Sequence, residues 1–458
     1  MRLRLAALAC LPAMSALAQT APVPPAASAE ARLAAIGTAP SAARIEADIR
    51  KLVSFGTRHT LSDTRSDTRG IGAARRWVFE EFQRISKDCG GCLEVRYVSG
   101  TIAGEKRIPD PVEVVNVIAI QRGSSDPNRF VLMSGDIDSR VSDVMNATAD
   151  APGANDDASG VAGTLEAARI LSKQKFAGSI VYAALSGEEQ GLFGGKILAE
   201  HALKQGWRVE AVLNNDMIGN SRGLNGVNDN HSVRVFSDGT RVTETAEEAR
   251  QRRFTGGEID SPSRNLARYI ARMSAYVPNL EVMMVYRLDR FGRGGHHRPF
   301  NDVGFPAVRV METNEHYDRQ HQDLRTEHGR VYGDTLDGVD FDYAARITAL
   351  NAVSLAGMAL APPPPAQVGI EGAVTADTTL TWARPPAGQA GNLAGYKLYW
   401  RLTTEPQWSR SRYVGDVTQA TLQNVVIDNY FFGVAAVAKD GSESPVVFPG
   451  AAGSFGAY

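Results

Sequence analysis

Apolar residues recur along the chain at two spacings, which together predict alternating helices and strands. In residues 41–54 and 68–86 they return every three or four positions, as on one face of an amphipathic helix. Six later segments are nearly continuous apolar runs, typical of buried strands: 113–120, 129–135, 179–185, 209–215, 281–287 and 306–312. Helical patterns at 158–172 and 192–203 lie among them. This alternation predicts an α/β fold with a mostly parallel sheet and helices on both faces.

The pattern changes at the end of this region. Residues 341–361 are largely apolar, but Arg346 and Asn351 interrupt them, so we expect a buried closing helix rather than a membrane span. Four consecutive prolines at 362–365, within a linker over 362–366, predict a stiff extended connection. Short alternating segments separated by turn residues follow, and they predict an all-β sandwich over residues 367–458.

The C-terminal segments resemble a fibronectin type III domain. Trp382 matches the buried tryptophan of an early strand, and Tyr396 matches a core aromatic of the central strand. Tyr430 and the residues after it resemble the tyrosine-bearing penultimate strand and its turn. The resemblance implies a binding or spacing module, for which a surface, a protein and a carbohydrate are candidate partners.

The N-terminal residues predict the compartment. A short cationic start and an apolar core that ends in Ala-Leu-Ala are typical of a signal peptide, here residues 1–18. Residues 19–40 are rich in Ala, Pro and Ser, and we expect a mobile leader. The protein is therefore expected to be exported, to the periplasm or the extracellular space. In such an oxidising compartment Cys89 and Cys92 favour a disulfide, with a thioredoxin-like redox site as the alternative. A zinc knuckle would need a second Cys/His pair nearby, and the sequence has none there.

Composition and charge restrict the class of function. Hydrophobic residues make up 43% and charged residues 22% of the chain, as in globular proteins, and the formal net charge is −2. A nucleic-acid partner is not expected, because it would need clustered positive charge.

Acidic residues and one histidine follow the predicted strands. They are Asp136, Asp138, Asp156, Asp157, Glu188, Glu189, Asp216 and His321. Ligand sites in open α/β sheets lie beyond the carboxyl ends of the strands, so the fold would gather these side chains in one crevice. A single carboxylate in such a position is more often a helix cap. Several together would repel one another and take up protons, unless a divalent cation kept them ionised.

The segments PGANDDASG, GEEQGL and NNDMIG, with a late histidine before Gln-Asp, resemble a known family. This is the family of co-catalytic zinc peptidases that includes bacterial leucyl aminopeptidase, plasma glutamate carboxypeptidase and the related glutaminyl cyclases. The resemblance covers residues 41–361 and implies a metallopeptidase domain there that binds two divalent metal ions. Zinc is the metal that the resemblance implies. Its peptide substrates would be hydrolysed by metal-activated water.

The resemblance also implies a role for each residue of the site. Asp156 would bridge the two metals, with Glu189 and His321 completing one site and Asp136 and Asp216 the other. Glu188 would be the general base. Asp138 would support the ligand two positions earlier, and Asp157 follows a peptide bond that the family often holds in cis. The roles are assigned to these positions: Asp136, Asp138, Asp156, Asp157, Glu188, Glu189, Asp216 and His321.

One position departs from the family pattern. The family usually has histidine where this chain has Asp136, in the segment Asp-Ile-Asp. A carboxylate also binds zinc, but it adds negative charge and makes the site harder. We therefore expect that manganese, cobalt or magnesium is tolerated at that site.

Basic residues between positions 287 and 316 are further candidates. The resemblance places His297 in contact with the tetrahedral oxyanion and His296 in a slot that is often acidic. His316 is a rival to His321 as a ligand. Four arginines surround this loop: Arg287, Arg290, Arg293 and Arg298. They are either solvated loop charges or a site for a substrate carboxylate.

Three classes of function remain open: a peptidase, a glutaminyl cyclase and a non-catalytic binding protein. The leading hypothesis is an exported dinuclear aminopeptidase with Glu188 as general base. A carboxypeptidase or dipeptidase of the same family would differ only in the loops that recognise the ends of the substrate. A glutaminyl cyclase would use one zinc, held by Asp156, Glu189 and His321. A non-catalytic binding protein would act through its C-terminal domain.

Overall fold

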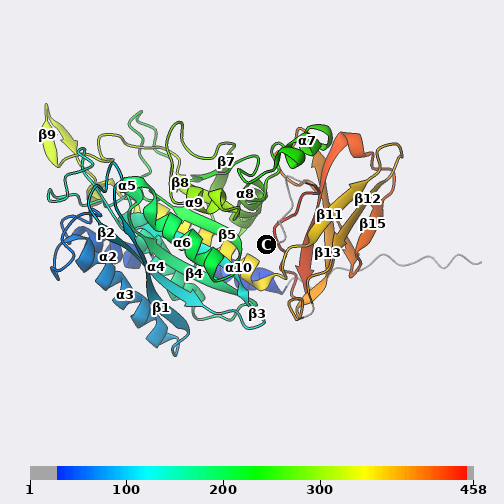
Figure 1. Ribbon diagram of the computed structural model, residues 1–458, viewed down its shortest axis with the longest axis horizontal. Coiled ribbons are helices and arrows are strands. Elements are labelled where there is room, and N and C mark those ends of the chain that lie inside the picture. The colour runs from blue at the N-terminus through cyan, green and yellow to red at the C-terminus, as the bar shows by residue number, and fades with distance from the viewer. Residues whose placement is uncertain (1–27, 387, 451–458) are drawn as a thin grey trace, which may run out of the picture.

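The computed structural model describes residues 28–386 and 388–450, which form an α/β domain followed by a smaller all-β domain (Figure 1). The helices of the first domain are α1 (Ala29–Gly37), α2 (Ala42–Val53), α3 (Gly70–Asp88), α4 (Ala158–Leu171), α5 (Glu188–Gly191), α6 (Phe193–Lys204), α7 (Ala246–Thr255), α8 (Pro262–Met273), α9 (His297–Asp302) and α10 (Phe341–Leu360). Its strands are β1 (Leu93–Ile102), β2 (Val112–Gln121), β3 (Asp126–Asp136), β4 (Gly178–Leu185), β5 (Arg208–Asn215), β6 (Ser232–Phe236), β7 (Glu281–Val285), β8 (Ala307–Glu312), β9 (Arg325–Glu327) and β10 (Arg330–Tyr332).

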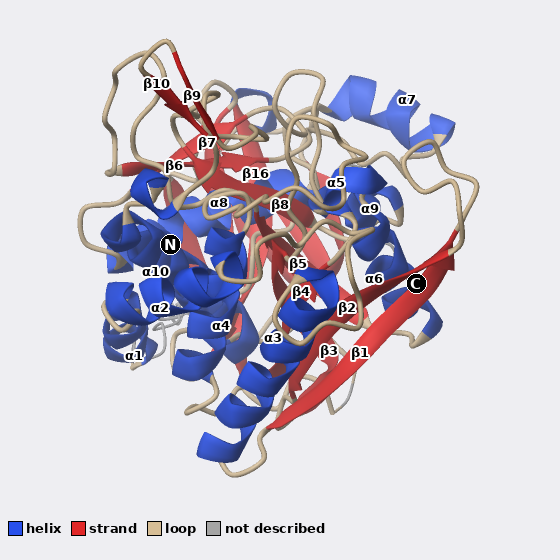
Figure 2. Cartoon of the chain, turned by 90° about the vertical axis from the view of Figure 1, so that its left-hand side faces the viewer, coloured by secondary structure: helices blue, strands red, loops and turns tan. Residues whose placement is uncertain are grey.

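Eight strands make one mixed sheet in the order β1-β2-β4-β3-β5-β8-β6-β7. Its centre is parallel, because β3 pairs in parallel with β4 and β5, and β5 pairs in parallel with β8. Helices α2, α3, α4 and α10 cover one face of the sheet, and α6 and α9 cover the other (Figure 2). The predicted α/β class, with a mostly parallel sheet and helices on both faces, is confirmed.

The six predicted strands and the helices between them are present, but several elements were missed. Strand β1 lies at the edge of the sheet and buries only Leu93 and Val98, so its sequence lacks a continuous apolar run. In the region before β7, helix α8 was missed because two of its buried residues are arginines: Arg264 and Arg268 are each 1% exposed. A buried arginine looks like a surface residue in sequence, since its polar partners come from elsewhere in the chain.

Three local predictions can be compared with the structure. Cys89 and Cys92 form a disulfide after α3, as predicted. Helix α10 is long and apolar enough to span a membrane, but 94% of its most apolar window is buried in the protein, so it is a core helix. The expected mobile leader is wrong for residues 29–37, because these form α1 and bury Leu33 and Ile36. The predicted signal peptide, residues 1–18, lies outside the described residues, as do residues 19–27 of the leader.

The all-β domain contains two three-stranded sheets. Their strands are β11 (Ala366–Glu371), β12 (Thr378–Ala383), β13 (Leu393–Leu402), β14 (Arg410–Gly415), β15 (Gln419–Leu422) and β16 (Tyr430–Ala438). The orders are β11-β12-β15 and β14-β13-β16, and side chains of both sheets share one core. The rings of Trp382 and Tyr396 lie 5.2 Å apart within it. The sandwich architecture agrees with the expectation, while the fibronectin type III identity stays a prediction.

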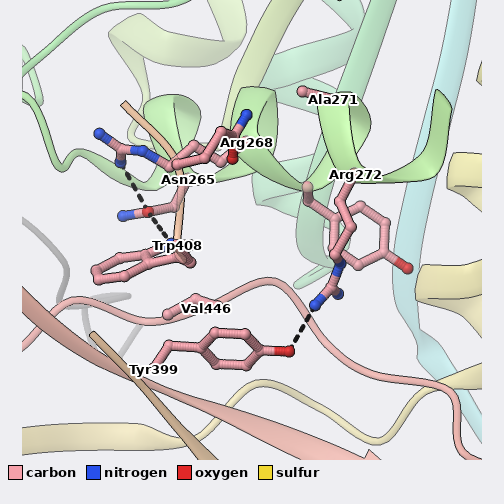
Figure 3. A pocket seen from close by; sticks show the side chains of 9 residues that line it. Asn265, Arg268, Ala271, Arg272, Tyr399, Trp408 and Val446 are labelled. Atoms are coloured by element: carbon pink, nitrogen blue, oxygen red, sulfur yellow. Dashed lines mark hydrogen bonds between the residues drawn. The ribbon is translucent and has the colours of Figure 1, made fainter. Parts of the chain in front are cut away.

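The two domains are joined by buried polar contacts in addition to the proline segment. Asp260 accepts hydrogen bonds from Arg268 of the first domain and from Arg401 of β13, and all three side chains are buried. Trp408 donates to Asn265 at 3.2 Å, next to a cavity of about 250 Å³ between the domains (Figure 3). The proline segment is itself mostly buried, so it is not a free spacer.

Candidate metal centre and active site

The predicted site residues meet at the carboxyl ends of the central parallel strands. Asp136 ends β3, Glu188 and Glu189 begin α5 shortly after β4, and Asp216 directly follows β5. The loop before α4 brings in Asp156, and the loop after β8 brings in His321. All of these except the buried Asp136 line one cavity of about 730 Å³. The strand ends therefore gather the side chains as the sequence predicted.

Asp156, Glu189 and His321 form one group of potential ligands. One ligand atom from each lies within 4.8 Å of the others. The Nε2 atom of His321 is 2.9 Å from Asp156 Oδ2 and 2.8 Å from Glu189 Oε1. Arg140 contacts both Glu189 Oε2 and His321 Nδ1 at 2.6 Å, which orients the carboxylate and the ring. This group coincides with one predicted metal site, and His316 does not belong to it.

A second group of potential ligands consists of Asp136, Glu188 and Asp216. One ligand atom from each again lies within 4.8 Å of the others. The predicted general base thus lies with the two carboxylates assigned to the second metal. The buried guanidinium of Arg309 lies 2.7 Å from Asp216 Oδ2 and 3.1 Å from Asp289 Oδ2. Sequence reasoning missed Arg309, because it lies inside an apolar strand with no motif around it.

A histidine stands beside Asp136. The Nδ1 atom of His296 is 2.6 Å from Asp136 Oδ1, a contact that needs one proton between the two groups. Asp136 Oδ2 and His296 Nε2 are both buried without a hydrogen-bond partner among the described residues. The sequence showed His296 as an unusual residue at an often acidic position, but nothing in it indicated the pairing with Asp136.

Asp138 holds the start of α5. Its carboxylate accepts hydrogen bonds from the backbone N–H groups of Glu188 and Glu189, both at 3.1 Å, and from the hydroxyl of Thr60 at 2.9 Å. It therefore supports the site through the two glutamates and not through the residue at 136. The predicted supporting role is retained with a different partner.

Asp157 connects three elements beneath the site. Its peptide bond to Asp156 is cis, as the resemblance implies. Its buried carboxylate accepts hydrogen bonds from the backbone N–H groups of Asp136 at 2.7 Å, Gly160 at 3.0 Å and Met217 at 3.0 Å. One side chain thus ties together the end of β3, the start of α4 and the residue after Asp216.

Burial and mutual repulsion change the proton affinities of the site. Burial, with added repulsion from Glu189 and Asp216, raises the pKa of Glu188 well above its usual range. Burial also raises the pKa of Asp216 to about 6, although Arg309 opposes the shift. Burial lowers the pKa of His296 to about 4. Burial would lower the pKa of His321 too, but the charges of Glu189 and Asp156 outweigh it and raise that pKa to about 9.

His297 does not occupy its predicted position. It is fully buried, its Nε2 is 2.8 Å from the carbonyl oxygen of Leu288, and it does not line the cavity. Burial lowers the pKa of His297 to about 4 despite the nearby Asp289. The predicted contact with the oxyanion is therefore not supported. The segment that carries His297 lines the cavity through other residues, such as Arg293 and Arg298, because the direction of each side chain depends on its tertiary contacts.

The donor set fits divalent metal ions. Each group offers carboxylate oxygens, and one adds an imidazole nitrogen, which are the atoms that zinc binds. Asp136 Oδ2 is a buried acceptor with no protein donor among the described residues, and a cation would satisfy it. The residues that would hold metal are Asp136, Asp156, Glu189, Asp216 and His321.

Comparison with known proteins agrees with this geometry. Residues 116–337 match the profile of Peptidase family M28. A probable zinc metalloprotease of Leptosphaeria maculans is 46% identical over 411 residues, which cover 89% of this chain and 94% of that protein. One from Pyricularia oryzae is 45% identical, with 89% of this chain and 82% of that protein covered. These alignments are longer than the α/β domain, so the relatives share much of the C-terminal domain as well.

Solved structures show the same fold. The LapA aminopeptidase of Legionella pneumophila superposes with a TM-score of 0.54 at 20% identity, covering 75% of this chain and 78% of that one. LapB of the same organism gives a TM-score of 0.54 at 18% identity, covering 72% and 76%. At this identity the likeness concerns the fold alone. The sequence relatives, together with the fold and the site, show that the chain belongs to peptidase family M28.

Proposed function

We propose that the chain is a zinc metallopeptidase with two metal ions that removes N-terminal residues from peptides. The observation that carries the proposal is the presence of two groups of potential ligands at one cavity, with Glu188 among them. The relatives named as probable zinc metalloproteases support the metal and the reaction class. Metal ions bound there would acidify a water molecule and polarise the scissile carbonyl.

The residues of the chain perform the remaining steps. Glu188 lines the cavity beside the candidate ligands, where its carboxylate can accept the proton of the attacking water and pass it to the leaving amine. Asp138 positions Glu188 by accepting its backbone N–H. Arg140 fixes Glu189 and His321, so both ligands are oriented before substrate binds.

Replacement of the proposed base tests the mechanism. Glu188→Gln should retain the wild-type metal content and lose about 10²- to 10⁴-fold in kcat, because only proton transfer is removed. Hydrolysis of aminoacyl nitroanilides with zinc supplied, together with elemental analysis of the protein, provides both measurements. Full activity in this variant would contradict the role of Glu188. A matched peptide with an acetylated N-terminus should resist cleavage if the enzyme is an aminopeptidase.

A glutaminyl cyclase with one zinc is the second candidate. The ion pair of Arg309 with Asp216, at 2.7 Å, places a fixed positive charge where the second metal would bind. In that case only Asp156, Glu189 and His321 would hold metal. About one zinc per chain, with release of ammonia from peptides that begin with glutamine, would favour the cyclase over the peptidase.

We also propose that the protein is exported and acts outside the cytoplasm. The signal-peptide pattern of residues 1–18 and the disulfide between Cys89 and Cys92 support this location. Sequencing the N-terminus of the mature protein from the periplasm or the medium tests it. A binding role of the C-terminal domain, toward a surface, a protein or a carbohydrate, is a separate proposal without a residue assignment.

A further inference from the structure

The cavity that holds the candidate active site has a strongly basic lining. Six cationic side chains contribute to it: Arg107, Arg140, Lys196, Arg290, Arg293 and Arg298. Its acidic residues are the candidate ligands and the base, together with Asp302, which is exposed and so well screened by water. With the ligand carboxylates committed to metal, the rest of the lining carries an excess of positive charge.

Two of these cations, Arg290 and Arg293, compete for the same carboxylate. Arg290 and Arg293 both pair with Glu315, at 3.1 and 2.9 Å, and Arg234 pairs with the same carboxylate at 3.1 Å. Arg290 also lies 3.2 Å from Asp289, but Asp289 already pairs with Arg309. One carboxylate cannot neutralise three guanidinium groups, so this side of the cavity keeps unpaired charge.

Arg298 and Lys196 have no carboxylate partner within residues 28–386 and 388–450. The Nε atom of Arg298 is buried without a hydrogen-bond partner there. Gly294 leaves room for this side chain, because a Cβ at that position would lie 2.7 Å from an Arg298 terminal nitrogen. Lys196 lies over the ring of Phe193, at 4.6 Å from its centroid. We call Arg290, Arg293, Arg298 and Lys196 the basic wall.

The basic wall begins beside the ligands. Arg293 donates to Gln320 Oε1 at 3.3 Å, and Gln320 donates to Asp156 Oδ2 at 3.4 Å. Only one side chain therefore separates Arg293 from a candidate metal ligand. A peptide whose scissile carbonyl is held at the ligands would place its neighbouring groups against this wall.

We propose that the basic wall selects substrates with a carboxylate close to the scissile bond, and that Arg298 binds this carboxylate. The inference rests on the proposed peptidase function. The carboxylate belongs either to an aspartate or glutamate side chain or to the free C-terminus of a short peptide. A guanidinium can bind either one with two hydrogen bonds, and because Arg298 has no carboxylate partner among the described residues, no ion pair must break first.

Matched substrates separate the two sources. Glu-Ala amide against Gln-Ala amide tests a side-chain carboxylate, and Leu-Ala against Leu-Ala amide tests a terminal one. For at least one pair we expect the acid to have a kcat/KM about 10- to 100-fold above its neutral twin, as a charged hydrogen bond gives. Arg298→Gln should reduce this ratio to about threefold or less, while Arg298→Lys should retain part of it.

Controls separate this inference from the proposed function. Arg287→Gln changes an exposed arginine of the same loop that does not line the cavity, so the ratio should stay at the wild-type value. Equal kcat/KM values for the acid and its neutral twin in both pairs would overturn the inference, and so would an acid-to-neutral ratio that Arg298→Gln leaves unchanged. In both cases the cleavage of peptides would still uphold the proposed function. If no peptide is cleaved, the function fails. The binding of the same peptide pairs to the zinc-loaded wild type, measured by calorimetry, then tests the inference. Equal affinities for the acid and the neutral peptide would overturn it.

Discussion

At position 136 this chain has a carboxylate where the family resemblance leads one to expect an imidazole. The structure supplies an imidazole behind it, since His296 contacts Asp136 at 2.6 Å. In many zinc sites a histidine binds the metal and a carboxylate orients the histidine. Here a histidine orients the carboxylate that is the candidate ligand. Burial keeps His296 neutral near pH 7 by lowering its pKa to about 4, so it adds no charge to a site already flanked by Arg309.

His321 makes the stability of the metal-free protein depend on pH. Its pKa in the folded protein is raised to about 9, above the usual 6.5. Its stabilising effect is therefore fully present below about pH 6.5 and is lost as the pH rises through about 9, by up to about 3 kcal/mol. Urea unfolding of chelator-treated protein should show a lower free energy of unfolding at pH 9 than at pH 6.5. Part of this decrease should disappear in His321→Gln.

If the free energy of unfolding falls equally with pH in the wild type and in His321→Gln, other groups cause the pH dependence.

A metal bound at Nε2 of His321 must displace the proton there. Metal binding at pH 7 should therefore release protons, which calorimetry in two buffers of different ionisation enthalpy detects.

At the scale of elements, the short helix α5 is held at its N-terminus by a side chain from a neighbouring strand end. Asp138, just beyond the end of β3, accepts both of the first backbone N–H groups of α5. Glu188 and Glu189 are those first two residues. A side chain just beyond the end of β3 therefore positions the candidate base and a candidate ligand that follow β4. The geometry of the site depends on this contact between two strand ends.

Weakening this contact should impair the site without unfolding the domain. Asp138→Asn replaces one acceptor oxygen by an amide donor, which then faces a backbone N–H, and we expect a 10- to 100-fold loss in kcat/KM or metal affinity. Thr60→Val is the matched control. It removes one hydrogen bond to Asp138 and leaves both backbone contacts, so its loss should be smaller. Wild-type kinetics and metal titration in Asp138→Asn would contradict the positioning role.

At the scale of the whole molecule, the C-terminal domain is fixed to the α/β domain at helix α8 and strand β7. Gln407 donates to Met284 of β7 at 3.4 Å, and Arg268 donates to the carbonyl of Pro406 at 2.8 Å. Strand β7 leads directly into the loop that carries Arg290 and Arg293. The C-terminal domain thus supports the segment that precedes the basic wall.

The buried pair of Arg401 and Asp260 tests the coupling of the domains. Both oxygens of Asp260 are 2.8 Å from Arg401, and both residues have no exposed surface. Arg401→Leu leaves a buried carboxylate short of one partner, which should cost about 3–5 kcal/mol in the free energy of unfolding. Arg412→Leu, at an exposed position of the same domain, should change it little. Equal stability of the two variants by denaturant unfolding would show that the interface pair is dispensable.

Much of the fold could be predicted from sequence because its signals are local. The central strands are buried on both faces, so their apolar runs are continuous, and Ser41 caps α2 by accepting the backbone N–H of Arg44. Strand β1 and helix α8 escaped prediction for the opposite reason. An edge strand has no continuous run, and the buried arginines of α8 depend on partners such as Asp260 and Ser237.

The sequence by itself determined the order of the site residues, since each follows a strand end or belongs to a motif that the family resemblance covers. Only the tertiary structure decided which residues stand behind them. His296 reaches Asp136 across 160 residues, Arg309 reaches Asp216 from a neighbouring strand, and His297 turns away to Leu288. The physical reason is that the candidate ligands lie at strand ends, and each strand end is marked by a local apolar run in the sequence. Charge compensation and side-chain direction arise from packing between distant segments, which no local pattern records.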